Sequence, residues 1–138
     1  MVATVRAQQE LRIDSEADVL VVRRAVKMLA HERKFDSFAC AAITTATSEL
    51  TRNAWVHGGG GVAVIEEVMN GDRIGLRVQF RDKGPGIPDL ARVLKGGYST
   101  AQTMGLGLSG SRRLVDVFTI ESIVGEGTVV TIVKWKPG

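Results

Sequence analysis

Four short stretches, widely separated along this chain, combine small and polar residues in a way that suits a bound ligand. Residues 49–57 read Glu-Leu-Thr-Arg-Asn-Ala-Trp-Val-His, and residues 82–86 read Asp-Lys-Gly-Pro-Gly. Gly105-Leu-Gly-Leu and Gly125-Glu-Gly-Thr128 complete the set. No single stretch is decisive, but together they supply what a nucleotide site without a Gly-x-x-x-x-Gly-Lys-Ser/Thr loop requires. The fold therefore has to bring four distant segments to one place.

Length and charge exclude several classes of protein. The 138 residues fit one domain, residues 1–138, with a substantial core. Lys and Arg exceed Asp and Glu by 18 − 15 = 3, and the basic residues are scattered, so we expect no nucleic-acid partner. The only cysteine, Cys40, excludes an intrachain disulfide and is expected to be buried in a helix. Without a signal peptide or membrane-length apolar run, the chain reads as cytoplasmic, with no membrane partner.

Hydrophobic spacing predicts the order β-α-α-β-β-α-β-β. The expected strands cover about 4–13 (an edge strand), 62–69, 73–81, 118–123 and 128–135, and the expected long helices about 16–33, 36–57 and 106–117. This order predicts a two-layer α/β sandwich, in which one layer of helices covers a mixed, mostly antiparallel sheet. The loop 83–104, with one short helix near 89–94, is too long for a plain connection, which favours a functional or mobile loop.

Local signals set the expected boundaries of these elements. Asp14 or Ser15 can cap the first helix, and Asp36 or Ser37 can cap the second. Asn70-Gly71 has the chemistry of a tight hairpin between two strands.

Glu49 and Asn53 stand four residues apart on the second helix, so their side chains project the same way. As a functional pair, Glu49 can act as a general base and Asn53 can give a neutral oxygen to magnesium. The plainer interpretation is two polar residues at the rim of an amphipathic helix.

Asp82-Lys-Gly-Pro-Gly86 follows directly after a predicted strand. Gly84 and Gly86 let the backbone approach a ligand closely, and Asp82 can accept a hydrogen bond from the amino group of adenine. An ordinary turn, which also uses glycine and proline, is the alternative.

The two remaining glycine-rich stretches also have two interpretations. Gly105-Leu-Gly-Leu-Ser-Gly110 matches a dinucleotide-binding pattern, but no strand precedes it, so a Rossmann fold is not expected. Free amides at a helix start can still bind phosphate, or the stretch is a flexible loop that closes onto a helix. Gly125-Glu-Gly-Thr128 is most simply a hairpin turn. Beside the other stretches, it can bring the Thr128 hydroxyl close to Asp82, where this hydroxyl would contact adenine through a water.

His31-Glu32 and His57 are interpreted as residues at helix ends, not as phosphate acceptors.

The four stretches together resemble the GHKL superfamily of gyrase, histidine-kinase and MutL-type ATP-binding domains, over residues 37–135. Within it the chain is similar to the small free-standing serine kinases of the anti-sigma type, and in particular to the switch kinases of the bacterial stressosome. The residues that carry this likeness are Thr44-Thr-Ala-Thr-Ser-Glu49, Arg52-Asn53, Asp82 to Pro88, Gly97-Tyr-Ser-Thr100, Gly105 to Leu108, Arg113-Leu, Asp116-Val-Phe, Glu121-Ser and Lys134-Trp135. The glycine run 58–61 departs from related proteins, which often have a bulkier residue there.

The resemblance implies a serine/threonine protein kinase that uses ATP and Mg²⁺. By motif, Glu49 is the base, Asn53 the magnesium ligand and Asp82 the residue that reads adenine. The remaining nucleotide contacts implied in this way are Gly84, Gly86, Gly97, Ser99, Thr100, Gly105, Leu106, Gly107 and Leu108, with Thr128 beside adenine. Residues 97–104 would form an ATP lid, and Arg52 would touch phosphate or the protein substrate.

The implied partners are STAS-domain substrates of a stressosome-like scaffold and a metal-dependent serine phosphatase, which the released kinase activates. The alternative is an anti-sigma factor that sequesters a sigma factor directly and phosphorylates an anti-anti-sigma STAS protein. Glu49 favours chemistry over pure binding, since a protein that only sequesters a partner needs no base.

Overall fold

Alternation of apolar and polar residues builds the sheet of this computed structural model, which describes residues 4–90 and 108–138. In chain order the elements are β1 Thr4–Ile13, α1 Ala17–Glu32, α2 Ser37–Val56, β2 Gly61–Asn70, β3 Arg73–Asp82, β4 Val117–Ile123 and β5 Gly127–Trp135. Residues 108–114 are also helical. All five predicted strands and the first two predicted helices are confirmed. The short helix predicted near 89–94 falls mostly outside the described residues.

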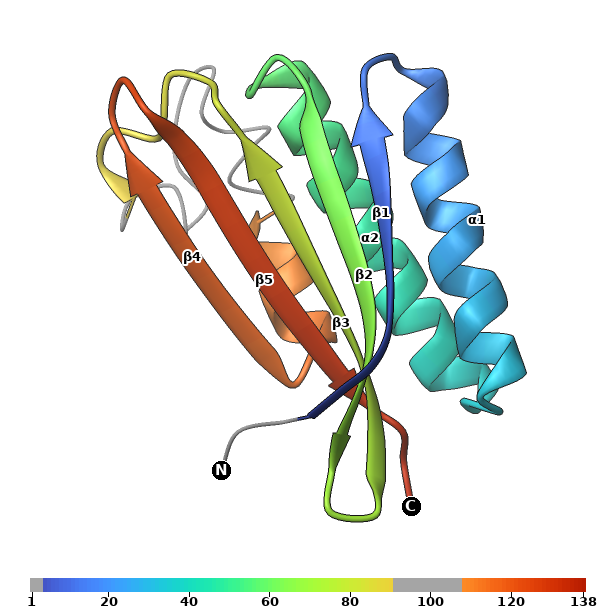
Figure 1. The fold of residues 1–138 in the computed structure, drawn as a ribbon. Coiled ribbons are helices and arrows are strands. Elements are labelled where there is room, and N and C mark those ends of the chain that lie inside the picture. The colour runs from blue at the N-terminus through green and yellow to red at the C-terminus, as the bar shows by residue number, and fades with distance from the viewer. Residues whose placement is uncertain (1–3, 91–107) are drawn as a thin grey trace.

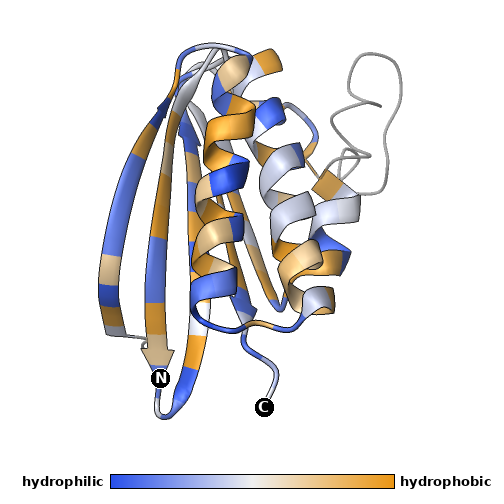
Figure 2. Ribbon diagram, turned by 90° about the vertical axis from the view of Figure 1, so that its right-hand side faces the viewer, coloured by the Kyte–Doolittle hydropathy of each residue, from blue (hydrophilic) through white to orange (hydrophobic). Residues whose placement is uncertain are grey.

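The strands lie in the order β1-β2-β3-β5-β4, with β1 at one edge as predicted (Figure 1). Helices α1 and α2 lie on one face of this sheet, and the edge-on view of Figure 2 separates the two layers. The predicted two-layer α/β sandwich is therefore confirmed. All four neighbouring strand pairs are antiparallel, so the sheet is more uniform than the mixed, mostly antiparallel sheet that we expected.

The core lies between the sheet and the two helices. On β3 the buried side chains recur at every second residue, namely Leu76, Val78 and Phe80. On α2 they follow helical spacing, at Ile43, Ala46, Leu50 and Ala54. Burying a side chain of the size of leucine stabilises a fold by roughly 1.5–3 kcal/mol, so these two rows hold the layers together. Cys40 is buried on α2 and has a free thiol, as predicted.

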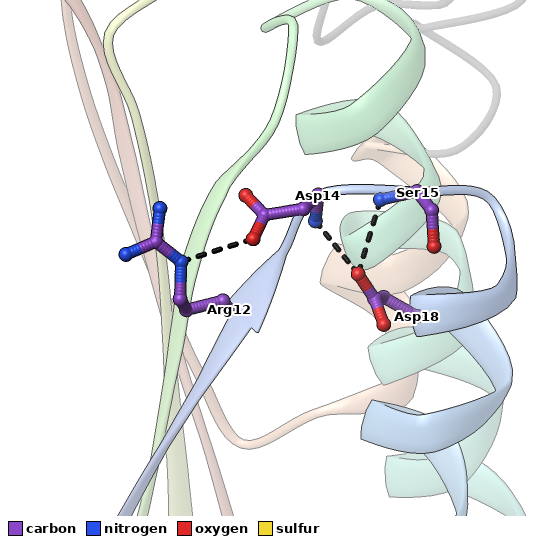
Figure 3. A network of polar contacts seen from close by, with 4 residues as sticks. All are labelled: Arg12, Asp14, Ser15 and Asp18. Carbon is purple, nitrogen blue, oxygen red and sulfur yellow. Dashed lines mark hydrogen bonds and ion pairs between the residues drawn. The ribbon is translucent and has the colours of Figure 1, made fainter.

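The two helix starts differ from each other in how they are capped. Asp36 caps α2, because its Oδ1 accepts a hydrogen bond from the backbone N–H of Ala39 at 2.7 Å. The prediction that Asp14 or Ser15 caps α1 is wrong. Instead Asp18, one turn inside, reaches back and accepts from the backbone N–H groups of both residues, at 2.7 and 3.0 Å (Figure 3).

The C-terminal helix ends before the predicted residue 117, because the chain joins the sheet there. Helical structure ends at residue 114, and β4 begins at Val117. The backbone N–H of Asp116 donates to the carbonyl of Val133 at 2.9 Å, and its carboxylate accepts from the backbone N–H of Trp135 at 2.7 Å. These bonds to β5 end the helix about three residues early.

Two turns fix the ends of the hairpins. Asn70 pairs with Arg73, and Gly71 has a φ of 62° at the first loop position, as the predicted tight hairpin requires. The predicted turn at 124–127 joins β4 to β5. Among the described residues, no helix is long and apolar enough to cross a membrane.

Candidate nucleotide-binding site

A hollow lies where the end of α2, the end of β3, the start of β5 and the helical segment 108–114 meet. The ends of α2 and β3 reach the same edge of the molecule in Figure 1. Five of the residues that we expected in a nucleotide site line this hollow: Asn53, Asp82, Gly86, Leu108 and Thr128. The fold thus brings together the described parts of all four sequence stretches.

Asp82 is the last residue of β3 and pairs with Thr128 on β5. Its Oδ1 accepts a hydrogen bond from the backbone N–H of Gly84 at 2.9 Å. Burial raises the pKa of the Asp82 carboxyl group above its ordinary value, and hydrogen bonds from the backbone of Gly84 and Thr128 oppose that shift. A carboxylate held in this way is costly to bury unless it meets a further donor, which suits recognition of an exocyclic amino group.

Glycines allow two chain segments to close around Asp82. A Cβ built on Gly58 would lie 2.4 Å from Cγ of Asp82, and one built on Gly84 would lie 2.7 Å from Cα of Gly58. Such distances are shorter than any real contact of a Cβ, so side chains at these positions would displace the carboxylate or the backbone. The glycine run after α2 therefore packs directly against the predicted adenine-reading residue. Gly84 supports the site from behind Asp82 and does not line the hollow.

Ser122 on β4 connects the Asp82–Gly86 loop to the sheet. Its Oγ accepts a hydrogen bond from the backbone N–H of Ile87 at 2.7 Å and lies 2.9 Å from Oγ1 of Thr128. Thr128 is buried and lies opposite Asp82, close to where we predicted it. Its hydroxyl bonds to Ser122, so the contact with Asp82 comes from the Thr128 backbone.

Glu49 and Asn53 lie one turn apart near the end of α2, as predicted. The Asn53 side chain lines the hollow, and its Nδ2 is buried without a hydrogen-bond partner among the described residues. An orphaned buried amide is unfavourable by itself, so Asn53 fits a role in holding a polar ligand. Glu49 is half-exposed outside the hollow, and its Oε1 lies 3.6 Å from Nη1 of Arg52.

Sequence reasoning missed part of the wall of the hollow. The missed apolar residues are Leu50, Ala54, Phe80, Ile87 and Val130, and the missed polar contribution comes from His57 and Gly58. Leu50 and Phe80 belong to the hydrophobic core, and each lies within three residues of a predicted site residue. Such proximity is the signal that could have identified them.

His57 was interpreted only as a helix-end residue. It does cap α2, with its backbone N–H donating to the carbonyl of Asn53 at 2.9 Å. Its side chain also lines the hollow, where burial lowers the pKa of the imidazole. Burial therefore disfavours the charged form of this imidazole.

Six predicted contacts lie outside the described residues: Gly97, Ser99, Thr100, Gly105, Leu106 and Gly107. The same holds for the predicted lid at 97–104. Leu108, the first described residue after them, is fully buried and contributes an apolar wall.

The site has the layout of an ATP-binding domain without a Walker loop, and comparison with known proteins agrees. The family model described as histidine kinase-, DNA gyrase B-, and HSP90-like ATPase matches residues 41–137. The chain belongs to this ATPase family, and ATP binding is the shared property of the class.

Within the family the similarity is more specific. The chain is 41% identical over 128 residues to serine/threonine-protein kinase RsbT of Bacillus subtilis, which covers 93% of this chain and 96% of that protein. It therefore belongs with the serine/threonine protein kinases of the RsbT type, as its resemblance to stressosome switch kinases implied. The anti-sigma F factor of Thermoanaerobacter sp. (strain X514) is 30% identical over 101 residues, which is 69% of each chain.

Two solved structures share the fold. The RsbU and RsbW domains of Rv1364c from Mycobacterium tuberculosis match with a TM-score of 0.60 and 21% identity, covering 96% of this chain and 33% of that one. The SiaB-SiaC complex from Pseudomonas aeruginosa matches with a TM-score of 0.55 and 12% identity, covering 95% and 90%. At these identities the likeness concerns the fold alone.

Proposed function

We propose that this kinase transfers the γ-phosphoryl group of ATP to a serine or threonine of a STAS-domain partner. Once its partner is phosphorylated, it is released to activate a serine phosphatase, as in a stressosome-like partner switch. The observation that carries the proposal is the fixed Asp82 carboxylate at the end of β3, in a hollow that also contains Asn53 and Thr128. Similarity to RsbT over nearly the whole chain supports the same activity.

In this proposal Asp82 is the residue that recognises adenine. Its buried carboxylate can accept from the amino group of adenine, whereas guanine presents an oxygen acceptor at the corresponding position. The apolar residues Leu50, Phe80 and Val130 line the same hollow and suit the faces of a purine ring. We therefore expect a preference for adenine over guanine nucleotides.

Phosphoryl transfer would depend on Asn53 and Glu49. Asn53 lines the hollow, and the Oδ1 of its side-chain amide is the atom that would hold Mg²⁺ beside the phosphates. Its unpartnered Nδ2 is a donor, which would suit a phosphate oxygen. When bound, Mg²⁺ neutralises charge on the phosphate oxygens. Glu49, one turn earlier on α2, would orient the attacking hydroxyl and take its proton.

A second candidate function rests on the similarity to an anti-sigma F factor. In that case the chain would also hold a sigma factor directly, and phosphorylation of an anti-anti-sigma STAS protein would regulate this complex. Both candidates share the kinase chemistry and differ in the protein that is sequestered.

Incubation of the purified protein with ATP, Mg²⁺ and the STAS proteins encoded near its gene tests the proposal. We expect phosphate to appear on a serine or threonine of one STAS protein, and phosphorylation to weaken its complex because it adds charge. A STAS protein with that residue changed to alanine is the matched control. Capture of a sigma factor with no modification of any STAS protein would contradict the main proposal, and capture together with STAS phosphorylation would support the second candidate.

A further inference from the structure

A second concave surface lies between α1 and α2, separate from the nucleotide site. The two helices lie side by side and are joined by a short turn, so they run in opposite directions (Figures 1 and 2). Between them is a groove of about 360 Å³, and none of the described residues lines both this groove and the hollow around Asp82. We refer to it as the interhelical groove.

One side of the interhelical groove is basic. Arg23, Lys27 and His31 line it from α1, and none of the described residues that line it carries a carboxylate. Among the described residues, neither Arg23 nor Lys27 forms a salt bridge. The neighbouring acids make other contacts: Glu32 lies 4.0 Å from Arg33, and Asp36 caps α2. The groove therefore presents Arg23 and Lys27 without an ion-pair partner among the described residues.

The opposite side of the groove is rich in hydroxyl groups. Ser37, Thr44 and Thr45 line it from α2. Thr44 is 5% exposed, and its Oγ1 has no hydrogen-bond partner among the described residues. Leaving a buried hydroxyl unpartnered is unfavourable, so a ligand that bonds to this side would offset a cost that the free protein carries.

The spacing of these three side chains limits the size of the ligand. Arg23, Lys27 and His31 recur at every fourth residue, so they extend over about 12 Å of helix at 1.5 Å per residue. A single phosphate cannot contact all three, whereas a peptide with several carboxylates can. Exposed apolar side chains are adjacent: Leu20, 61% exposed, precedes Arg23 by one turn, and Phe38, 84% exposed, precedes Ala41 of the groove. Apolar rims suit a protein partner better than a nucleic-acid backbone.

We propose that the interhelical groove docks an acidic, amphipathic segment of a partner protein. Carboxylates of the segment lie along Arg23, Lys27 and His31, and its apolar residues cover Leu20 and Phe38. This docking site is distinct from the nucleotide site and does not depend on which residue is phosphorylated.

Fluorescence anisotropy with a defined probe tests the proposal. The probe is a fluorescein-labelled helical peptide with glutamates at every third or fourth position beside leucines, and a glutamine version is its control. We expect saturable binding of the glutamate peptide that weakens with added salt. The double variant Arg23→Glu, Lys27→Glu should bind about tenfold more weakly or worse, because it replaces attraction by repulsion.

The matched control variant is Arg6→Glu, Arg24→Glu, which makes the same charge change at two exposed sites outside the groove. It should keep the affinity of the native protein for the peptide. ATP affinity and the thermal midpoint, measured on both variants, separate a loss of docking from a loss of the fold or of the nucleotide site. The proposal is overturned if the native protein does not bind the peptide, or if the control variant loses as much affinity. It is also overturned if single-stranded DNA of equal charge displaces the peptide and binds more tightly, since the groove would then be a nucleic-acid surface.

Discussion

Gly58 lies directly against the carboxyl group of Asp82, so closely that a Cβ on Gly58 would stand 2.4 Å from Cγ and 2.6 Å from Oδ2. This relationship connects the end of α2, which carries Asn53, to the end of β3. A helix and a strand that are distant in sequence are thereby fixed at one corner of the hollow. The geometry therefore requires glycine at position 58.

Gly58→Ala should therefore weaken ATP binding. The added methyl group has to push the Asp82 carboxylate aside or shift the backbone of α2, since Ala54 O would also lie only 2.7 Å away. We expect about a tenfold loss of ATP affinity by calorimetry, which corresponds to about 1.4 kcal/mol. Gly59→Ala is the matched control, because its Cβ would meet no atom of the described part of the chain within 4 Å. Its positive φ of 75° costs stability, roughly 1 kcal/mol, but leaves Asp82 in place. Equal ATP affinities for the two variants would contradict the role of Gly58.

Asp82→Asn should make the free protein more stable at neutral pH and at the same time weaken ATP binding. The pKa of Asp82 is raised from its ordinary value of 3.8, chiefly by burial. The folded state thus holds this proton more tightly than the unfolded state, and stability falls as pH rises from the ordinary value through the raised one. Asparagine has no charge to bury and still accepts from Gly84.

Thermal unfolding of both proteins between pH 3 and 8, a range that spans the ordinary carboxyl value, measures this effect. The stability advantage of Asp82→Asn should be small at the acidic end and grow as pH rises. An advantage that is constant over the whole range would show that ionisation of Asp82 is not its cause.

Local patterns predicted much of this fold. Strand periodicity, helix periodicity and turn chemistry depend on residues that are close in sequence. Local sequence was therefore enough to predict strand β3, helix α2 and the turn at Asn70-Gly71. The spacing of Glu49 and Asn53 likewise placed both on one side of α2. The glycines of the stretch 82–86 identified Asp82 as a candidate from the sequence alone.

What the sequence did not reveal depends on contacts between distant segments. Ser122 reads as an ordinary polar strand residue, and only the approach of β4 to the Asp82–Gly86 loop gives it the N–H of Ile87. His57 likewise became a wall residue through the packing of α2 against β3. Glu67 is only 5% exposed, and Arg33, 34 residues away, donates a hydrogen bond to its buried carboxylate. The spacing of apolar residues along the chain cannot predict such contacts between distant residues.

Ser122→Ala should loosen the loop that forms one wall of the hollow. The variant leaves the N–H of Ile87 without its acceptor and removes the partner of the Thr128 hydroxyl, which costs about 1–3 kcal/mol. We expect a lower thermal midpoint and a several-fold loss of ATP affinity. Thr119→Ala, at an exposed position on the same strand, should change neither quantity appreciably. If the two alanine variants behave alike, Ser122 does not hold the loop.

Glu49→Gln should separate nucleotide binding from phosphoryl transfer. Glu49 is outside the hollow, half-exposed and 3.6 Å from Arg52, so an amide of the same size should leave ATP affinity and the thermal midpoint near those of the native protein. Without a base, transfer to a protein substrate should slow by about 10²–10⁴-fold. Single-turnover transfer from radiolabelled ATP, with the protein saturated by both substrates, measures this step alone. Glu10→Gln, an exposed residue of β1, is the control for loss of one carboxylate. Transfer at the native rate by Glu49→Gln would assign the base elsewhere, and a parallel loss of ATP affinity would mean that Glu49 acts in binding.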